Sequence, residues 1–287
     1  MEYHNKLPPE GINTTAVHPL KQFFQMIIAA IVLVVLLIAV LQFSGSFLAK
    51  RIPFSFETAI VSKVEVPFGD ASKHPELTRY LNELAKRLMA NMPIPDGMTV
   101  QVHYESEEIF NAFATVGGNL LFYKGLLQEM PNENMLAMVM AHEVSHVLHR
   151  DPIAAMGGGV ASAIAVLGLT GNAGTGPAGS VLNMAGSLTS VQFTRGMELA
   201  ADRQALAALY STYGHVGGAA ELFELFSEQR GDSSTALTQW FERFSSTHPL
   251  DADRIERMNN IAGEKEWPVV GDITPLPADF FRWLRAD

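Results

Sequence analysis

The chain of 287 residues contains no cysteine. Disulfide bonds and thiolate metal ligands are therefore excluded, and any metal ion must be held by His, Asp or Glu side chains. Basic residues are also scarce: 20 Lys and Arg stand against 30 Asp and Glu, which gives a formal net charge of −10. Nucleic-acid binding calls for Lys and Arg gathered on one face, and the sequence has no such cluster. We therefore expect no nucleic-acid partner.

Uncharged runs long enough to cross a membrane are rare in the chain, and segment 23–43 is the clearest. Its length and apolar composition match a helix that spans a bilayer, so we interpret it as a single-pass N-terminal anchor with the membrane lipid bilayer as a partner. A cleaved signal peptide is the alternative, because small residues follow the run. Lys6 and Lys21 before it and Lys50 and Arg51 after it are nearly balanced, so the positive-inside rule gives little help with orientation. The short tail before the anchor favours an extracytoplasmic, periplasmic location for the rest of the chain.

The chain is expected to divide into three parts: a polar tail at 1–22, the anchor at 23–43 and one domain at 52–287. A domain of that length can bury a sizeable core. Within it, the Gly-, Ala- and Ser-rich segment 156–191 has two interpretations, a packed helix with a loop or a weak second membrane segment. Its many glycines break up a long helix and favour the first interpretation.

Residue spacing predicts an α+β fold that is mostly helical. Apolar residues recur at helical intervals in segments 75–92, 133–150, 188–212, 216–229 and 251–262. Strand patterns are found at 56–67, 98–104, 112–116 and 119–123. Gly117-Gly118 separates the last two and predicts a hairpin. These strands are expected to form a small antiparallel sheet.

The pentapeptide His-Glu-Val-Ser-His at 142–146 carries the clearest chemical signal. In a helix, residues four apart share a face, so His142 and His146 can direct one imidazole each at a common ion. A zinc ion with three protein ligands keeps a fourth position for water and lowers the pKa of that water, and Glu143 can then take the proton as general base. The surrounding helix is apolar except at these positions and at Ser145. The alternative, a core of hydrogen-bonded histidines, would need several buried acceptors in place of the metal.

A third ligand is expected on a second helix, where Glu198 and Asp202 lie four residues apart on one face. We assign Glu198 to the metal, and Asp202 to a hydrogen bond that fixes the tautomer of a ligand histidine. For Asp202, the alternative is an ion pair with Arg195 or Arg203. The rival third ligand is His149, three residues past the pentapeptide, although one helix would then supply all three ligands.

Further short motifs stand in order along the chain: Asn111-Ala-Phe-Ala, Gly117-Gly118, Gly125-Leu-Leu, Ala141-His-Glu-Val-Ser-His, Glu198-x-x-Ala-Asp202 and Thr247-His-Pro. Together they resemble the HtpX-related and CAAX prenyl protease-related gluzincin zinc metallopeptidases over roughly residues 75–260. The resemblance implies a zincin-like domain with one zinc ion per chain, bound by His142, His146 and Glu198, and with Glu143 as the base. Because the chain has one convincing span, it is most similar to the single-domain, membrane-anchored branch of that family.

The resemblance also assigns a substrate-binding strand. It implies that Asn111, Ala112, Phe113 and Ala114 lie along the cleft, where their backbone binds an extended substrate by strand addition. From spacing alone, an ordinary edge strand whose Asn caps a turn is an equal alternative.

Two residues near the C-terminus are implied to be catalytic. His248 and Arg254 match a His-Pro and a following Arg of the family, and either can stabilise the oxyanion formed when water attacks a peptide carbonyl. Alternatively, His248 simply precedes a helix that begins around Pro249 and Asp251. A further hypothesis is that His248 reaches the metal and occupies the water position until substrate displaces it.

The leading interpretation is a zinc-dependent endopeptidase tethered to the membrane. It would hydrolyse unfolded or membrane-associated proteins in quality control, by attack of a metal-activated water. The alternative is a non-catalytic zinc-containing protein, chaperone-like or partner-binding, in which the zinc is structural. A structural site is expected to close its fourth position with a protein ligand, whereas a catalytic site keeps that position open.

Overall fold

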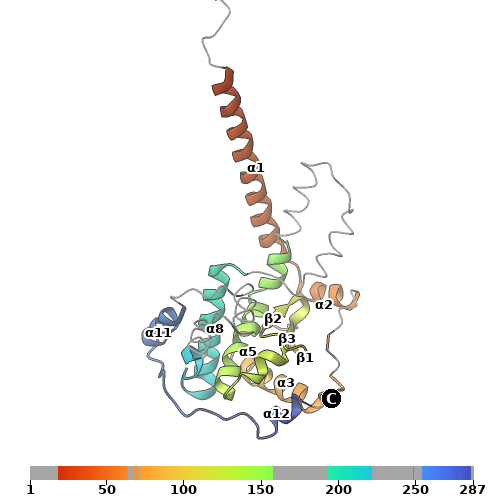
Figure 1. Ribbon diagram of the computed structural model, residues 1–287, viewed down its shortest axis with the longest axis vertical. Helices are drawn as coiled ribbons and strands as arrows, with labels where there is room; N and C mark the ends of the chain where they lie inside the picture. The colour runs from red at the N-terminus through yellow and green to blue at the C-terminus, as the bar shows by residue number, and fades with distance from the viewer. Residues whose placement is uncertain are drawn as a thin grey trace, which may run out of the picture.

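The computed structural model describes residues 19–63, 68–69, 71–157, 193–221, 248 and 254–285. One long helix, α1 (Pro19–Ala49), projects away from a body of helices and strands (Figure 1). Its window Leu20–Leu37 is long and apolar enough to cross a membrane, and none of it is buried against the rest of the chain. A signal sequence near an N-terminus satisfies the same criteria, so α1 is a candidate membrane span by its length and composition only.

The first element after α1 is a helix, α2 (Phe54–Lys63), and the strand predicted from 56 onwards is wrong over that range. The predicted remainder, 64–67, lies outside the described residues. Val, Ile and Thr favoured a strand, but strand propensity yields to tertiary contacts. The helix places Glu57 and Val61, four residues apart, on one face. Glu57 Oε2 accepts a hydrogen bond from the amide of Gly117 at 2.9 Å, and Val61 packs beside Val116.

The sheet has three strands in the order β1-β3-β2: β1 (Gln101–Glu105), β2 (Ala112–Thr115) and β3 (Asn119–Tyr123). The predicted hairpin is confirmed, because β2 and β3 pair antiparallel with Ala114 opposite Leu120. A short turn, η1 (Val116–Gly118), joins them, and both of its glycines have positive φ.

The sheet as a whole is mixed, because β1 pairs with β3 in parallel. The antiparallel sheet expected from the sequence is therefore correct for the hairpin and wrong for the third strand. Gly117-Gly118 specifies how its own two strands pair, but it carries no information on the direction in which a more distant strand joins the open edge of β3. As a consequence, β2 is left at an edge of the described sheet.

Four of the five predicted helices are confirmed, with ends that differ by a few residues, and the fold is α+β and mostly helical. They are α3 (Pro75–Met89), α5 (Glu133–Leu148), α8 (Arg195–Tyr213) and α11 (Arg254–Glu264). Two short helices that were not predicted are α4 (Lys124–Gln128) and α12 (Phe280–Trp283). Of the segment predicted at 216–229, residues 216–218 form a turn, residues 219–221 are helical, and 222–229 lie outside the described residues. Segment 156–191 is interpreted from its sequence as a packed helix with a loop; its first two residues are helical, and 158–191 lie outside the described residues.

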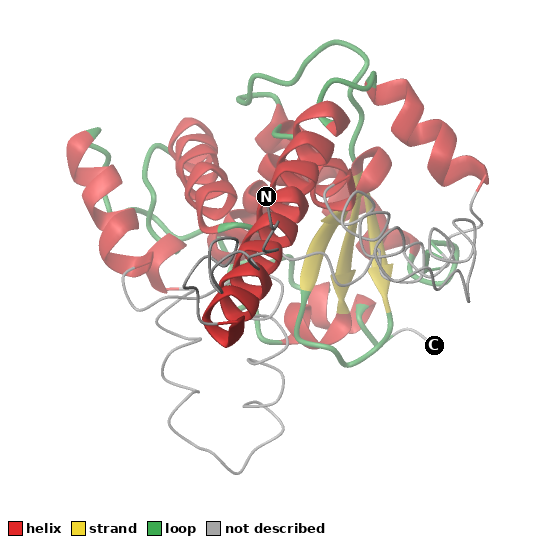
Figure 2. Cartoon of the chain, turned by 90° about the horizontal axis from the view of Figure 1, so that it is seen from above, coloured by secondary structure: helices red, strands yellow, loops and turns green. Residues whose placement is uncertain are grey.

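Helix α5 is the centre of the core. It contacts α3, α8 and β2, and Figure 2 shows the three strands beside the group of helices. The α3 face toward it carries Leu77, Leu81 and Leu88, each fully buried. The Asn132 side chain caps the start of α5 by accepting from the amide of Met135 at 2.9 Å. Because α5 is surrounded by protein on all sides, its polar residues can lie only where other polar groups meet them.

Candidate metal centre

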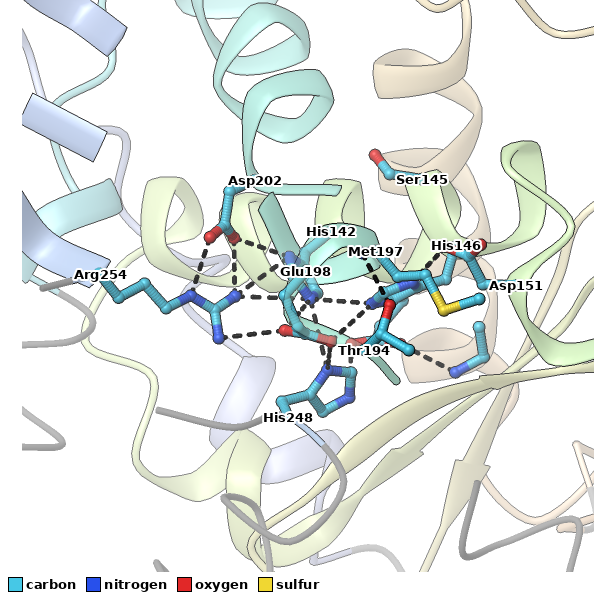
Figure 3. Close-up of polar contacts among 12 residues, drawn as sticks. His142, Ser145, His146, Asp151, Thr194, Met197, Glu198, Asp202, His248 and Arg254 are labelled. Atoms are coloured by element: carbon cyan, nitrogen blue, oxygen red, sulfur yellow. Dashed lines mark hydrogen bonds and ion pairs between the residues drawn. The ribbon is translucent and has the colours of Figure 1, made fainter. Parts of the chain in front are cut away.

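Four buried side chains from separate parts of the chain meet at one point (Figure 3). Helix α5 contributes His142 and His146, and α8 contributes Glu198. His248, which lies between α8 and α11 in the sequence, completes the group. One ligand atom from each lies within 4.8 Å of the others. Two of these residues are one helical turn apart on α5, and the Nε2 atoms of His142 and His146 are 3.1 Å apart.

The Glu198 carboxylate joins the two histidines. Its Oε2 lies 3.3 Å from His142 Nε2, and its Oε1 lies 3.3 Å from His146 Nε2. Because one carboxylate reaches the inner nitrogen of both rings, all three groups point at the same small volume. This is the arrangement expected of three ligands around one ion.

The outer nitrogen of each histidine meets a different carboxylate. His142 Nδ1 is 3.0 Å from Asp202 Oδ1, and His146 Nδ1 is 3.0 Å from Asp151 Oδ2. An ionised carboxylate accepts hydrogen bonds and cannot donate one, so each pair places a ring N–H on Nδ1. When each ring is neutral, its Nε2 keeps a lone pair directed at the centre, which is the tautomer a metal-binding histidine requires.

The charges around the centre favour a cation. Four carboxylates are buried there, those of Glu143, Asp151, Glu198 and Asp202. The described cations that pair with these carboxylates are Arg254 and Lys50. With neutral imidazoles, the described site carries two more negative than positive charges. A divalent cation would balance this excess.

The pKa shifts have the same origin. Burial lowers the pKa of His142, but the carboxylates of Glu198 and Asp202 outweigh that effect and raise it to about 10. Burial raises the pKa of Glu198, and the nearby rings of His248 and His142 bring it well below its ordinary value. Two imidazole nitrogens and a carboxylate oxygen are a typical zinc donor set. The residues therefore fit a divalent metal on charge, tautomer and donor type.

Glu143 lies beside the four-residue group rather than in it. Its side chain is fully buried, and Oε2 accepts a hydrogen bond from the backbone amide of Ala114 on β2 at 2.8 Å. The other oxygen, Oε1, is 3.4 Å from His248 Nε2. The carboxylate is thus fixed by the sheet on one side and faces the centre on the other.

Arg254, at the start of α11, connects the carboxylates of α8. Its Nε and Nη2 donate to the two oxygens of Asp202 at 2.9 and 2.6 Å, and its Nη1 lies 3.2 Å from Glu198 Oε2. Burial raises the pKa of Asp202, and the Arg254 guanidinium and His142 bring it below its ordinary value. The structure places Asp202 between His142 and Arg254, whereas the sequence offered Arg195 or Arg203 as its alternative partners.

Of the other residues singled out in the sequence, His149 caps the C-terminal end of α5 and does not belong to the four-residue group. Residues 112–114 lie on β2, next to the centre, with Asn111 just before them. Phe113 packs on the face of the sheet that carries Leu121 and Tyr123.

Two residues of the site were missed in the sequence. Asp151, which holds His146 Nδ1, lies five positions after His146, where the chain has just left α5. An acid immediately beyond the helix end was the available signal. Phe193 stacks on the His146 ring, with centroids 3.9 Å apart and an interplanar angle of 16°. Nothing in the sequence near Phe193 indicates that contact.

A buried helix with two histidines one turn apart, a carboxylate ligand from a second helix and a further carboxylate aimed at the same point are the features of a zincin-type metallopeptidase centre. The model of the family described as "Peptidase family M48" matches residues 72–262, which is more than half of the chain. The chain belongs to this family.

Individual relatives agree with the family match. The beta-barrel assembly-enhancing protease of Yersinia pestis is 30% identical over 201 residues, which cover 66% of this chain and 40% of that protein. The protease HtpX homolog of Burkholderia mallei (strain SAVP1) is 30% identical over 228 residues, covering 67% and 76%. The mitochondrial metalloendopeptidase OMA1 of Schizosaccharomyces pombe is 29% identical over 203 residues, covering 67% and 55%. The chain spans about two fifths of the length of the first of these relatives.

Proposed function

We propose that this protein is a zinc-dependent endopeptidase tethered to a membrane by α1. The observation that carries the proposal is the position of Glu143, a buried carboxylate fixed by the Ala114 amide and facing the centre formed by His142, His146 and Glu198. A purely structural zinc site has no use for a carboxylate held beside the ligands. A hydrolytic site needs one as a general base.

In this proposal the residues of the chain divide the work. Zinc, when bound by His142, His146 and Glu198, supplies a Lewis acid and lowers the pKa of water. Glu143 accepts the proton of the attacking water at a carboxylate oxygen, and later returns it to the leaving amine. Its bond to the Ala114 amide keeps the carboxylate from rotating away from the centre.

Substrate binding is assigned to the outer edge of β2. The Ala114 amide points away from β3, and backbone groups two residues apart point to the same side of a strand. The amide and carbonyl of Ala112 and the carbonyl of Ala114 therefore face outward and are available to an extended peptide. Asn111 Oδ1 is buried and lacks a hydrogen-bond partner among the described residues, which supports a contact with substrate there.

Arg254 and His248 take different parts. All three guanidinium nitrogens of Arg254 face Asp202 or Glu198, which favours a role in holding the ligand carboxylate over direct contact with an oxyanion. His248 Nδ1 is 3.1 Å from Glu198 Oε1 and 3.4 Å from His142 Nε2, which supports a role for His248 as a fourth ligand. We assign this arrangement to a latent form, in which substrate displaces His248 and frees the ring to face the oxyanion.

The proposed substrates are unfolded or membrane-associated proteins, cut in quality control on the extracytoplasmic side. Support comes from the exposed apolar surface of α1 and from the name of the Yersinia pestis relative, a protease that enhances assembly of beta-barrel proteins. In strand addition, the substrate is held by hydrogen bonds to its backbone rather than by particular side chains, so this mode of binding suits chains without a fixed structure.

A second candidate function is a non-catalytic zinc protein that binds unfolded chains. The position of His248 as a fourth ligand favours it, because a closed coordination shell is typical of structural zinc. The full chain in lipid nanodiscs, incubated with casein, separates the two. The endopeptidase is expected to cut casein, to stop when zinc is chelated and to recover when zinc is restored. Binding of casein without cleavage, in zinc-loaded protein, would favour the second function.

A further inference from the structure

The end of the anchor helix reaches the candidate metal centre through one acidic residue. Lys50, directly after α1, donates from Nζ to Asp151 Oδ1 at 2.7 Å. The other oxygen of Asp151 is 3.0 Å from His146 Nδ1. Asp151 is 1% exposed and His146 is fully buried, whereas Lys50 is 38% exposed at the surface. A single carboxylate thus joins a cation at the base of α1 to the outer nitrogen of a ligand histidine.

A second connection runs from the same segment to the substrate strand. Arg150 follows α5 with φ of 60°, and its guanidinium pairs with Glu57 Oε1 and donates to the carbonyl of Ile52 at 2.8 Å. The other oxygen of Glu57 accepts from the Gly117 amide, in the turn between β2 and β3. Residues 50–57, which we name the juxtamembrane segment, therefore contact both the end of the metal-binding helix and the turn of the hairpin.

Close packing holds the base of α1 in place. Ala49 packs with Val116 and Ile153 in a small apolar cluster apart from the main core. A Cβ atom on Gly157 would lie 2.6 Å from the carbonyl oxygen of Gly45 and 2.7 Å from Ala49 Cβ, so only glycine allows this approach. The anchor end is therefore seated against the helical segment 151–157, which carries Asp151.

We propose that Lys50 is a positioning residue for the metal centre. By holding Asp151, it keeps the His146 ring in the tautomer and orientation that a metal needs, and so links the base of the membrane anchor to metal affinity. Lys50 lies one residue farther from the metal than Asp151 does. Its removal is therefore expected to weaken zinc binding by less than the roughly 10- to 100-fold that is typical when a residue bonded directly to a metal ligand is removed.

This inference rests on the proposed function in one respect, that His146 binds zinc. The test measures zinc affinity of the full chain in nanodiscs by competition with a chromophoric chelator, so it does not depend on activity. The variants are Lys50→Met, the charge-preserving Lys50→Arg, Asp151→Asn, the double variant Lys50→Met/Asp151→Asn, and the matched control Arg51→Met. Arg51 is the neighbouring cation, and its guanidinium lies over the Phe47 ring at 4.5 Å. Lys50→Gln replaces Lys50→Met if the latter does not fold.

We expect Lys50→Met to weaken zinc binding by about three- to tenfold, Lys50→Arg to restore most of it, and Arg51→Met to leave it unchanged. In the Asp151→Asn background, Lys50→Met is expected to add nothing, because its effect passes through Asp151. Equal affinity of Lys50→Met and wild type would overturn the inference and leave the proposed function standing. The inference would also be overturned if Lys50→Met weakened zinc binding as much in the Asp151→Asn background as in the wild type. An equal loss of zinc affinity in Arg51→Met would overturn it too. A wild-type chain that binds no zinc would overturn the proposed function, and the inference with it.

Discussion

The backbone amide of Ala114 donates a 2.8 Å hydrogen bond to Oε2 of Glu143, which ties an edge strand to the proposed catalytic base. This bond uses an amide that does not take part in pairing with β3. Strand and base are consequently held in one register, so a peptide added to the edge of β2 would lie beside the carboxylate.

The Ala114 amide can be removed by proline, which has no N–H. We expect Ala114→Pro to lower kcat for casein by about tenfold or more, because Glu143 is no longer fixed, while zinc affinity stays near that of the wild type. The matched variant is Ala112→Pro, on the same edge but without a bond to Glu143, and it should act mainly on KM. Unchanged kcat in Ala114→Pro would show that the bond does not position the base.

The carboxylates behind the two histidines should govern metal affinity. We expect Asp202→Asn and Asp151→Asn each to weaken zinc binding by roughly 10- to 100-fold, because each leaves a ligand ring without its ionised acceptor. Titration against a competing chelator measures the loss. Glu256→Gln, an exposed acid on α11, removes the same charge away from the centre and serves as control. Affinities equal to the control would mean that neither carboxylate supports a ligand.

His248 distinguishes a latent centre from an open one. Since its ring is proposed to take the fourth position on the metal, we expect His248→Ala to raise basal casein cleavage severalfold at equal zinc content. The assay compares initial rates of variant and wild type under zinc saturation. A rate that is unchanged would remove the gating role, and a rate lower by on the order of a hundredfold would assign His248 to the oxyanion alone.

A stability test addresses the core away from the metal. Glu133, at the start of α5, accepts from Tyr80 Oη at 2.9 Å, Arg87 Nη2 at 2.6 Å and Tyr213 Oη at 3.0 Å. We expect Glu133→Ala to lower the free energy of unfolding by about 2–4 kcal/mol, because two half-buried tyrosine hydroxyls and the Arg87 guanidinium lose a charged acceptor. Glu83→Ala, exposed on α3, should change it by less than about 0.5 kcal/mol. Equal denaturant midpoints for the two variants would contradict this account of how α3, α5 and α8 are joined.

Much of the fold could be predicted from the sequence because the signals were local. The apolar spacing of α3 and α5 and the glycines between β2 and β3 act within a few residues of themselves, and the structure confirms them. The meeting of His142 and His146 at one point, with Glu143 beside them, likewise follows from helical spacing.

Features that depend on distant contacts could not be predicted. Helix α2 has a composition that favours a strand, and its helical form rests on contacts of Glu57 and Val61 with the hairpin turn. The parallel pairing of β1 depends on the path of the chain between strands. Asp151 lies close to His146 in sequence, yet its second partner, Lys50, is separated from it by 101 positions, and no local pattern joins them.

The central claim, a hydrolytic metal centre with Glu143 as its base, is tested most directly by one variant. Zinc content and casein cleavage should be measured side by side for the wild-type chain and for Glu143→Gln, which keeps the shape of the side chain and removes its basicity. We expect both proteins to bind one zinc ion, and the variant to lose cleavage by about 100-fold or more. Cleavage by Glu143→Gln at the wild-type rate, with zinc bound, would contradict the claim.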